Sequence, residues 1–286
     1  MSVEDIKQNA VCVANTTLKF TAEGSGTPLL VIGSSIYYPR TFSQKLKQHC
    51  KIICADLPHF VQLTPAFRLG SISFELYANC IESIRIAAGL EEVVIVGHSH
   101  HGNIALEYAK RYPQNVSRIV LIGSPPVDIA HTVAGSERYW ISHASDNRKA
   151  ILKHRRNLID EKYMASLFPE AAYVAQYVAD APLYWYNPTY DASWLWQGMT
   201  FGMEAVHSFR GLYQVYEMNY DTESPKVPVL IVMGRYDYAV PHTLWKNALS
   251  RLQHVTFKVL DRSGHTPQLE QPNAFDKILL EWLHRQ

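Results

Sequence analysis

The chain has 286 residues, of which 47% are hydrophobic and 19% charged, and its formal net charge is +1 at pH 7. This length and composition can bury a large core, as one domain with an insertion or as two domains, which disfavours a disordered protein. The nearly balanced charge and the lack of a basic block give no reason to expect a nucleic-acid or anionic-membrane partner.

Targeting signals and cysteine usage indicate the compartment. The first ten residues contain no apolar signal segment, and no apolar run approaches the ~18 residues of a membrane span. Cys12, Cys50, Cys54 and Cys80 include no Cys-x-x-Cys pair, as expected of reduced thiols, although Cys50 and Cys54 are close in sequence. We therefore expect a cytoplasmic protein with no membrane partner. Whether it is a monomer or a homodimer stays open.

The N-terminal part of the chain alternates predicted strands and helices. Its buried strands are short apolar runs, and its clearest amphipathic helix ends at Gly89, a residue suited to a helix C-terminus. The predicted elements are edge strands within 10–20, a strand over 29–32 ending at Gly33, a helix over 41–48, a strand over 51–55 and a helix over 74–89. This alternation predicts a parallel sheet covered by helices on both faces.

The stretch over residues 91–111 combines a strand, a tight turn and a helix. The apolar run at 93–96 is typical of a strand buried on both faces, and an amphipathic segment follows until Tyr112 and Pro113. Ser99 lies in the turn between them. A serine in this context is expected on a sharp, strained bend, with its hydroxyl clear of the sheet and near the first backbone N–H groups of the helix.

The character of the chain changes between residues 125 and 221. After a further buried strand at 116–122, this segment contains no convincing strand, several helix-like stretches and many aromatic residues. Most of those aromatics are expected to form the segment's own core, and a few to line a substrate pocket. Strands are predicted again at 229–233 and 255–260, and an amphipathic helix at 275–283.

Two further candidate catalytic residues follow these last strands. Asp237 lies in a Gly-x-x-Asp-x-x-x-Pro loop, and His265 follows Gly264 and precedes a Glu-x-Pro sequence. The order Ser99, Asp237, His265, each just after a buried strand, is the order of a nucleophile, acid and base on this kind of sheet. A serine hydroxyl needs a neighbouring base, and that base needs a carboxylate to fix its tautomer.

These motifs together resemble the α/β-hydrolase superfamily, in particular proline iminopeptidases, small esterases and haloperoxidase-like enzymes. The resemblance implies a mostly parallel sheet with helices on both faces, a core of residues 1–124 and 222–286, and a helical cap inserted at 125–221. Two positions depart from the family pattern. His101 replaces the small residue expected two places after the serine, and Ile32 replaces the histidine expected before Gly33. Gly102 matches the second glycine that many members carry.

The resemblance also implies a mechanism. Ser99 would attack a small ester, thioester or amide, His265 would take its proton, and Asp237 would orient His265. The backbone N–H groups of Ser34 and His100 would form the oxyanion hole, and an acyl-enzyme would be hydrolysed by water. No cofactor is implied, because the chain supplies both nucleophile and base.

Other hypotheses stay open at this point. An aminopeptidase resembling proline iminopeptidase would need a carboxylate such as Glu204 to hold the substrate ammonium, and carbon–carbon bond hydrolysis is also available to the fold. His98, His100 and His101 could be metal ligands, although side chains in such an elbow diverge. His101 and Ile32 also raise the possibility of a ligand-binding receptor without turnover.

Overall fold

The computed structural model describes residues 8–214, 216 and 224–285 and contains one eight-stranded sheet. The strand order is β1-β2-β4-β3-β5-β6-β7-β8, and from β4 to β8 all neighbours are parallel. β1 and β2 are antiparallel additions at one edge, as the N-terminal pattern predicts. The strands are β1 (Gln8–Val13), β2 (Thr16–Glu23), β3 (Thr27–Gly33), β4 (Cys50–Asp56), β5 (Val93–His98), β6 (Val116–Ile122), β7 (Val229–Gly234) and β8 (Val255–Leu260).

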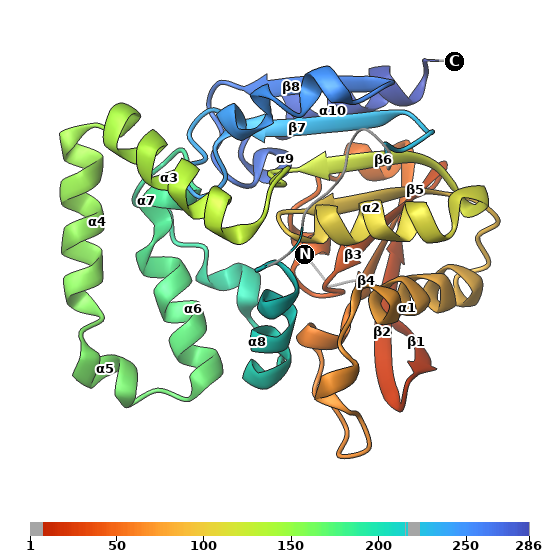
Figure 1. The fold of residues 1–286 in the computed structure, drawn as a ribbon, viewed down its shortest axis with the longest axis horizontal. Coiled ribbons are helices and arrows are strands. Elements are labelled where there is room, and N and C mark those ends of the chain that lie inside the picture. The colour runs from red at the N-terminus through yellow and green to blue at the C-terminus, as the bar shows by residue number, and fades with distance from the viewer. Residues whose placement is uncertain (1–7, 215, 217–223, 286) are drawn as a thin grey trace.

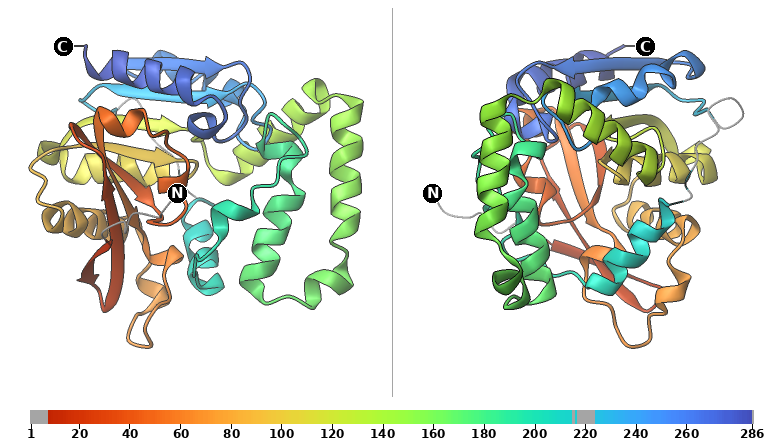
Figure 2. Two further views of the ribbon diagram at one scale, coloured as in Figure 1. Left: turned by 180° about the vertical axis from the view of Figure 1, so that it is seen from behind. Right: turned by 60° about the vertical axis from the view of Figure 1, so that its left-hand side comes forward.

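Helices cover both faces of this sheet (Figures 1 and 2). Alternate strand residues contribute to two separate apolar clusters, with Ile95 in one and Val96 in the other. Each fully buried aliphatic side chain contributes about 1.5–3 kcal/mol to folding, so apolar runs without alternation are stable here. The helices of the two faces are α1 (Phe74–Ala87) and α2 (His101–Arg111) on one side, and α9 (Pro267–Glu270) and α10 (Pro272–Leu283) on the other.

A group of helices lies between β6 and β7 in sequence, beyond the carboxyl ends of the parallel strands (Figure 1). The described part of this insertion contains no strand, as predicted, while the predicted boundary between residues 221 and 222 lies outside the described residues. Its helices are α3 (Ile129–His143), α4 (Asp146–Leu158), α5 (Glu161–Ala165), α6 (Pro169–Ala179), α7 (Ala181–Tyr184) and α8 (Met203–Leu212). Among the described residues, no helix is both long and apolar enough to span a membrane.

The prediction of a helix over 41–48 is wrong. The chain forms only short 3₁₀ turns there, Tyr38–Arg40 and Leu46–Gln48. The hydroxyl of Ser43 accepts the Leu46 N–H at 2.9 Å and donates to Asp276 Oδ2 at 2.6 Å. A serine side chain that bonds to nearby backbone in this way competes with helical hydrogen bonding, and the contact with α10 fixes the irregular path.

Candidate active site

Ser99 occupies the bend between β5 and α2. Its φ of 55° lies in the left-handed region, which is costly for a residue with a side chain and common at functional bends. Close packing explains the glycines on either side of it. A Cβ on Gly97 would lie 2.5 Å from the Gly102 Cα, and a Cβ on Gly102 would lie 2.1 Å from the Ser124 hydroxyl oxygen. The sequence pattern therefore predicts this elbow correctly.

His101 does not crowd the elbow, because its side chain points toward the loop after β3. It packs on Gly33, where a Cβ would lie 2.8 Å from His101 Cε1. Gly33 has a φ of 136°, and the ring of Tyr38 lies on the same side of it. The missing side chain of Gly33 thus makes room for a histidine at position 101.

Asp237 and His265 come together at the carboxyl ends of β7 and β8. His265 Nδ1 lies 2.7 Å from Asp237 Oδ2, and Asp237 is fully buried. The other oxygen, Asp237 Oδ1, accepts the backbone N–H groups of Ala239 at 3.1 Å and Val240 at 2.8 Å. A carboxylate that faces Nδ1 fixes the proton there and leaves the Nε2 lone pair free to act as a base.

The loop that carries His265 is held by a second carboxylate, the partly buried Glu270. Glu270 accepts backbone N–H groups from Gly264 at 2.8 Å, Tyr186 at 2.7 Å and Thr266 at 3.3 Å. Burial raises the pKa of Glu270 to about 7, against the lowering effect of these hydrogen bonds. The Glu-x-Pro sequence therefore serves to fix the backbone on both sides of His265.

The loop after β3 presents Ser34 to the same place. Its hydroxyl accepts the backbone N–H groups of Ile36 and Tyr37, both at 3.1 Å, and Asp56 Oδ1 accepts the neighbouring Ser35 N–H at 2.6 Å. Within the described part of the chain, the backbone N–H groups of Ser34 and His100 have no acceptor. Ser34, Ser99 and His100 line the same cavity, and two unpaired donors that face the nucleophile are the arrangement that an oxyanion needs.

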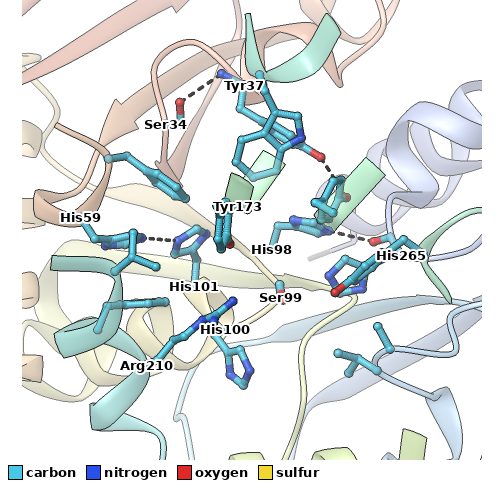
Figure 3. A pocket seen from close by; sticks show the side chains of 18 of the residues that line it. Ser34, Tyr37, His59, His98, Ser99, His100, His101, Tyr173, Arg210 and His265 are labelled. Atoms are coloured by element: carbon cyan, nitrogen blue, oxygen red, sulfur yellow. Dashed lines mark hydrogen bonds between the residues drawn. The ribbon is translucent and has the colours of Figure 1, made fainter. Parts of the chain in front are cut away.

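Ser99 and His265 line one cavity of about 370 Å³, between the sheet and the inserted helices (Figure 3). No hydrogen bond joins the two side chains among the described residues, and such bonds are often long in unliganded sites. All five predicted site residues except Asp237 line this cavity, and Asp237 lies behind His265. The structure thus brings together the full set predicted from the sequence: Ser99, Asp237, His265, Ser34 and His100.

Aromatic side chains form much of the cavity wall. The inserted helices supply Tyr173, Tyr177, Tyr184 and Trp196, and the loop after β3 supplies Tyr37. Tyr173 and Tyr177 were not foreseen individually, although their i, i+4 spacing places them on one face of α6. Tyr38 and His59 were also missed, because nothing local distinguishes them from ordinary turn residues.

The described cavity wall carries a positive charge and no carboxylate. Arg210, from α8, is the cationic side chain lining the cavity, and no aspartate or glutamate is among the described lining residues. Its guanidinium lies 5.4 Å from the centroid of the Tyr173 ring, and Figure 3 shows it extending into the pocket. Burial, followed by the charge of His265, lowers the pKa of His100 to about 4, and the Arg210 charge makes a smaller contribution in the same direction. Glu204, the candidate ammonium ligand, is exposed on α8 and does not line the cavity.

The three histidines of the elbow diverge. His98 Nε2 donates to the backbone oxygen of His265 at 2.8 Å, His101 Nε2 lies 3.0 Å from His59 Nε2, and the His100 ring packs on Tyr213. The described residues include no cluster of three or more histidine, cysteine or carboxylate side chains placed to hold a metal ion. The Nε2 atoms of His98 and His101 thus face different partners, while their Nδ1 atoms both contact the Tyr38 hydroxyl, at 3.3 and 2.8 Å.

Comparison with known proteins places this geometry in context. The family pattern of the alpha/beta hydrolase fold matches residues 31–272. The AB hydrolase superfamily protein YclE of Bacillus subtilis is 32% identical over 272 residues, covering 93% of this chain and 95% of the relative. The 2-hydroxy-6-oxononadienedioate/2-hydroxy-6-oxononatrienedioate hydrolase 1 of Dechloromonas aromatica is 21% identical over 241 residues. This match covers 82% of this chain and 76% of the relative.

Solved structures show the same architecture. An alpha/beta fold family hydrolase from Bacillus anthracis superposes with a TM-score of 0.71, covering 96% of this chain and 99% of that one. At 18% sequence identity, this likeness concerns the fold alone. The predicted fold class and the resemblance stated from the motifs are both confirmed.

Proposed function

We propose, since the chain belongs to the α/β-hydrolase family, that it is a serine hydrolase that cleaves a small ester, thioester or amide through an acyl-enzyme on Ser99. The observation that carries the proposal is the 2.7 Å contact between His265 Nδ1 and Asp237 Oδ2 in a cavity shared with Ser99. Family membership supports a hydrolase, and this contact supports a serine mechanism in particular.

The reaction would proceed in two steps. Ser99 Oγ attacks the substrate carbonyl while His265 Nε2 takes the hydroxyl proton, and the backbone N–H groups of Ser34 and His100 hold the oxyanion. His265 then gives the proton to the leaving group. A water molecule that is deprotonated by His265 attacks the acyl-enzyme and releases the acid.

The insertion at 125–221 would act as a cap on a core of residues 1–124 and 222–286. Support comes from its five aromatic residues in the cavity wall, Phe209 of α8 among them, which give it a direct part in substrate selection. A cytoplasmic location is supported by the cysteines, which are all free thiols: Cys12, Cys50, Cys54 and Cys80.

The cavity favours a neutral or anionic substrate. A substrate ammonium would meet Arg210 and no carboxylate among the described lining residues, so the aminopeptidase hypothesis gains no support. An acidic group would meet a cation. The Dechloromonas relative is, by its name, a hydrolase of a dioate, which agrees with an acid-bearing substrate and keeps carbon–carbon bond hydrolysis as the second candidate.

The test is labelling of the purified protein by a fluorophosphonate probe. Labelling is expected in the parent, absent in Ser99→Ala and strongly reduced in His265→Ala, because only an activated serine attacks the probe at a useful rate. Ser250→Ala, which changes an exposed serine outside the site, is the matched control and should label like the parent. A folded parent that neither labels nor hydrolyses activated esters above the buffer rate would contradict the proposal and favour the receptor hypothesis.

A further inference from the structure

A continuous row of buried hydrogen bonds runs along the cavity wall and ends at the loop that carries His265. It consists of histidine and tyrosine side chains from four parts of the chain, and we refer to it as the His–Tyr chain. Figure 3 shows two of its links, His59 to His101 and His98 to the His265 backbone. In order, its members are Tyr77, His59, His101, Tyr38 and His98.

The donor and the acceptor in each bond can be worked out from the end of the chain at the His265 backbone oxygen. The backbone oxygen of His265 can only accept, so His98 Nε2, at 2.8 Å, must carry a proton. A neutral His98 then has a lone pair on Nδ1. Its neighbour at 3.3 Å is the Tyr38 hydroxyl, and we infer that this hydroxyl points its hydrogen at His98, because no other donor reaches that lone pair among the described residues.

The same argument continues to the other end. The Tyr38 hydroxyl has used its single hydrogen, so His101 Nδ1, at 2.8 Å, must donate to the Tyr38 oxygen. His101 Nε2 is then an acceptor, and His59 Nε2, at 3.0 Å, donates to it. His59 Nδ1 in turn accepts from the Tyr77 hydroxyl at 2.8 Å. Each ring nitrogen of the chain has one partner and the Tyr38 hydroxyl has two, one as donor and one as acceptor, so no proton is missing and none is in excess.

The histidines must be neutral for this pattern to exist, and their surroundings keep them so. Burial lowers the pKa of His59 and of His98 to about 3. Burial, followed by the neighbouring histidines, lowers the pKa of His101 well below its usual value. An extra proton on His101 would also place two N–H groups face to face at the contact between His59 Nε2 and His101 Nε2, which is unfavourable for buried polar groups.

The His–Tyr chain connects the loops that supply the proposed catalytic groups. Tyr38 follows the Ser34 turn after β3, His59 follows β4, and His98 and His101 flank Ser99. The far end holds the backbone of His265. Because it ends on a carbonyl oxygen and not on the His265 ring, it cannot pass a proton to the reacting atoms.

We propose that the His–Tyr chain is a positioning device, which sets the distance between the oxyanion-hole loop, Ser99 and His265 through one fixed direction of hydrogen bonding. This proposal rests on the proposed function for its kinetic consequence but not for its proton arrangement. The proposal also explains the histidine at position 101. The family pattern expects a small residue there, and a glycine or alanine would interrupt the His–Tyr chain between His59 and Tyr38.

The proton arrangement is tested by NMR of the parent protein labelled with ¹⁵N-histidine, near pH 7. The expected result is a proton on Nε2 of His98 and of His59, and on Nδ1 of His101. A proton on His101 Nε2, or a charged imidazole at any of the three positions, would overturn the proposal. This outcome does not depend on whether the protein labels with a fluorophosphonate, so the two proposals can fail separately.

The kinetic consequence is tested with Tyr38→Phe, which removes the central hydroxyl. We expect kcat for a 4-nitrophenyl ester to fall about 10- to 100-fold with little change in KM, because small displacements of catalytic groups affect the reaction more than binding. His101 should also lose its preference for the Nδ1 proton in the NMR spectrum. Tyr108→Phe is the matched control, since this buried tyrosine donates to Glu82 Oε2 at 2.8 Å, outside the His–Tyr chain and away from the cavity wall.

An unchanged kcat in a folded Tyr38→Phe variant would overturn the positioning role, even if the tautomers are as expected. If Tyr38→Phe does not fold, His59→Gln takes its place, because its amide nitrogen can still donate toward His101. We expect His59→Gln to retain more of kcat than His59→Leu, which has no donor. Equal losses in the two variants would contradict the proposal.

Discussion

The loops of the sheet and the inserted helices build opposite sides of the same cavity by different means. On the sheet side, Asp237, Glu270 and the His–Tyr chain hold the proposed catalytic groups through short, directional hydrogen bonds. On the inserted side, aromatic rings of the cavity wall pack on one another, and the Tyr177 hydroxyl makes a long contact of 3.4 Å with the Tyr37 hydroxyl. Directional bonds fix angles, which proton transfer requires, whereas ring packing fixes mainly shape.

This difference predicts where substitutions act. Loss of a directional bond on the sheet side should lower kcat. Loss of a contact on the inserted side should change KM or substrate preference, because the contacts there meet substrate atoms far from the reacting bond.

The largest effect is expected for Asp237→Asn. The Ala239 and Val240 N–H groups require an oxygen at the position of Asp237 Oδ1, so the new amide nitrogen would face His265 Nδ1. His265 would then carry its proton on Nε2 and lose its role as a base. We expect kcat to fall by about 10⁴-fold with a small change in KM, measured on a 4-nitrophenyl ester.

Asp261→Asn is the control for that variant. Asp261 is an exposed residue paired with Arg235 outside the cavity, and its replacement should leave kcat unchanged. A loss of less than 10-fold in Asp237→Asn would mean that another group orients His265, or that His265 is not the base.

Glu270→Gln should change the pH dependence of stability. Burial raises the pKa of Glu270 from 4.5 to about 7, so between these values the folded state keeps a proton that the unfolded chain has lost. The free energy of unfolding of the parent therefore falls as pH rises through this window, by up to about 1.4 kcal/mol per pH unit from this group. The Glu270→Gln variant has no ionisable group at this position and so lacks this pH-dependent contribution to the free energy of unfolding. Urea denaturation at several pH values between 4.5 and 8 measures the difference between parent and variant.

The expected signature is a parent-minus-variant difference that declines from pH 4.5 to 7 and is constant above about pH 8. Glu204→Gln, at an exposed position on α8, should give a constant difference throughout and serves as the control. Parallel curves for the parent and Glu270→Gln would show that Glu270 has no raised pKa.

Much of the sheet side could be read from the sequence, because its signals are local. A buried strand, a turn with small residues and a reactive side chain are contiguous at Ser99, Asp237 and His265. The His–Tyr chain could not be read in this way. His59 and His101 are separated by 42 residues, and their contact depends on the packing of the β3 and β4 loops against the elbow.

For the inserted side, the sequence predicts a helical segment rich in aromatic residues but not which of its residues face the cavity. Its lack of strands and its aromatic content were evident, but the residues that face the cavity are selected by how the helices pack on the core. The helix predicted over 41–48 does not form for a related reason, because a contact between Ser43 and Asp276 in the last helix overrides the local helical pattern.

Arg210→Gln should alter substrate preference on the inserted side. An ester with a free carboxylate can pair with the Arg210 guanidinium, whereas an uncharged ester of similar size cannot. We expect KM for the 4-nitrophenyl monoester of glutaric acid to rise about 10-fold, consistent with the loss of a charge-assisted hydrogen bond. The KM for 4-nitrophenyl pentanoate should change little. Arg210→Lys, which keeps the charge, is the matched control, and an equal change for both esters would exclude a role in recognising an acid.

The smallest effect is expected for Tyr177→Phe. At 3.4 Å, the hydroxyl contact with Tyr37 is too long to contribute much, while the ring of Tyr177 still packs on Tyr184 and Trp196 at centroid distances of 4.6 and 5.1 Å. We expect kcat/KM to change by less than about threefold, and Tyr177→Ala to change it far more, because a large-to-small change leaves a void in the wall. A loss in Tyr177→Phe as large as that in Tyr38→Phe would place directional bonding on the inserted side as well, and the contrast between the two sides would no longer hold.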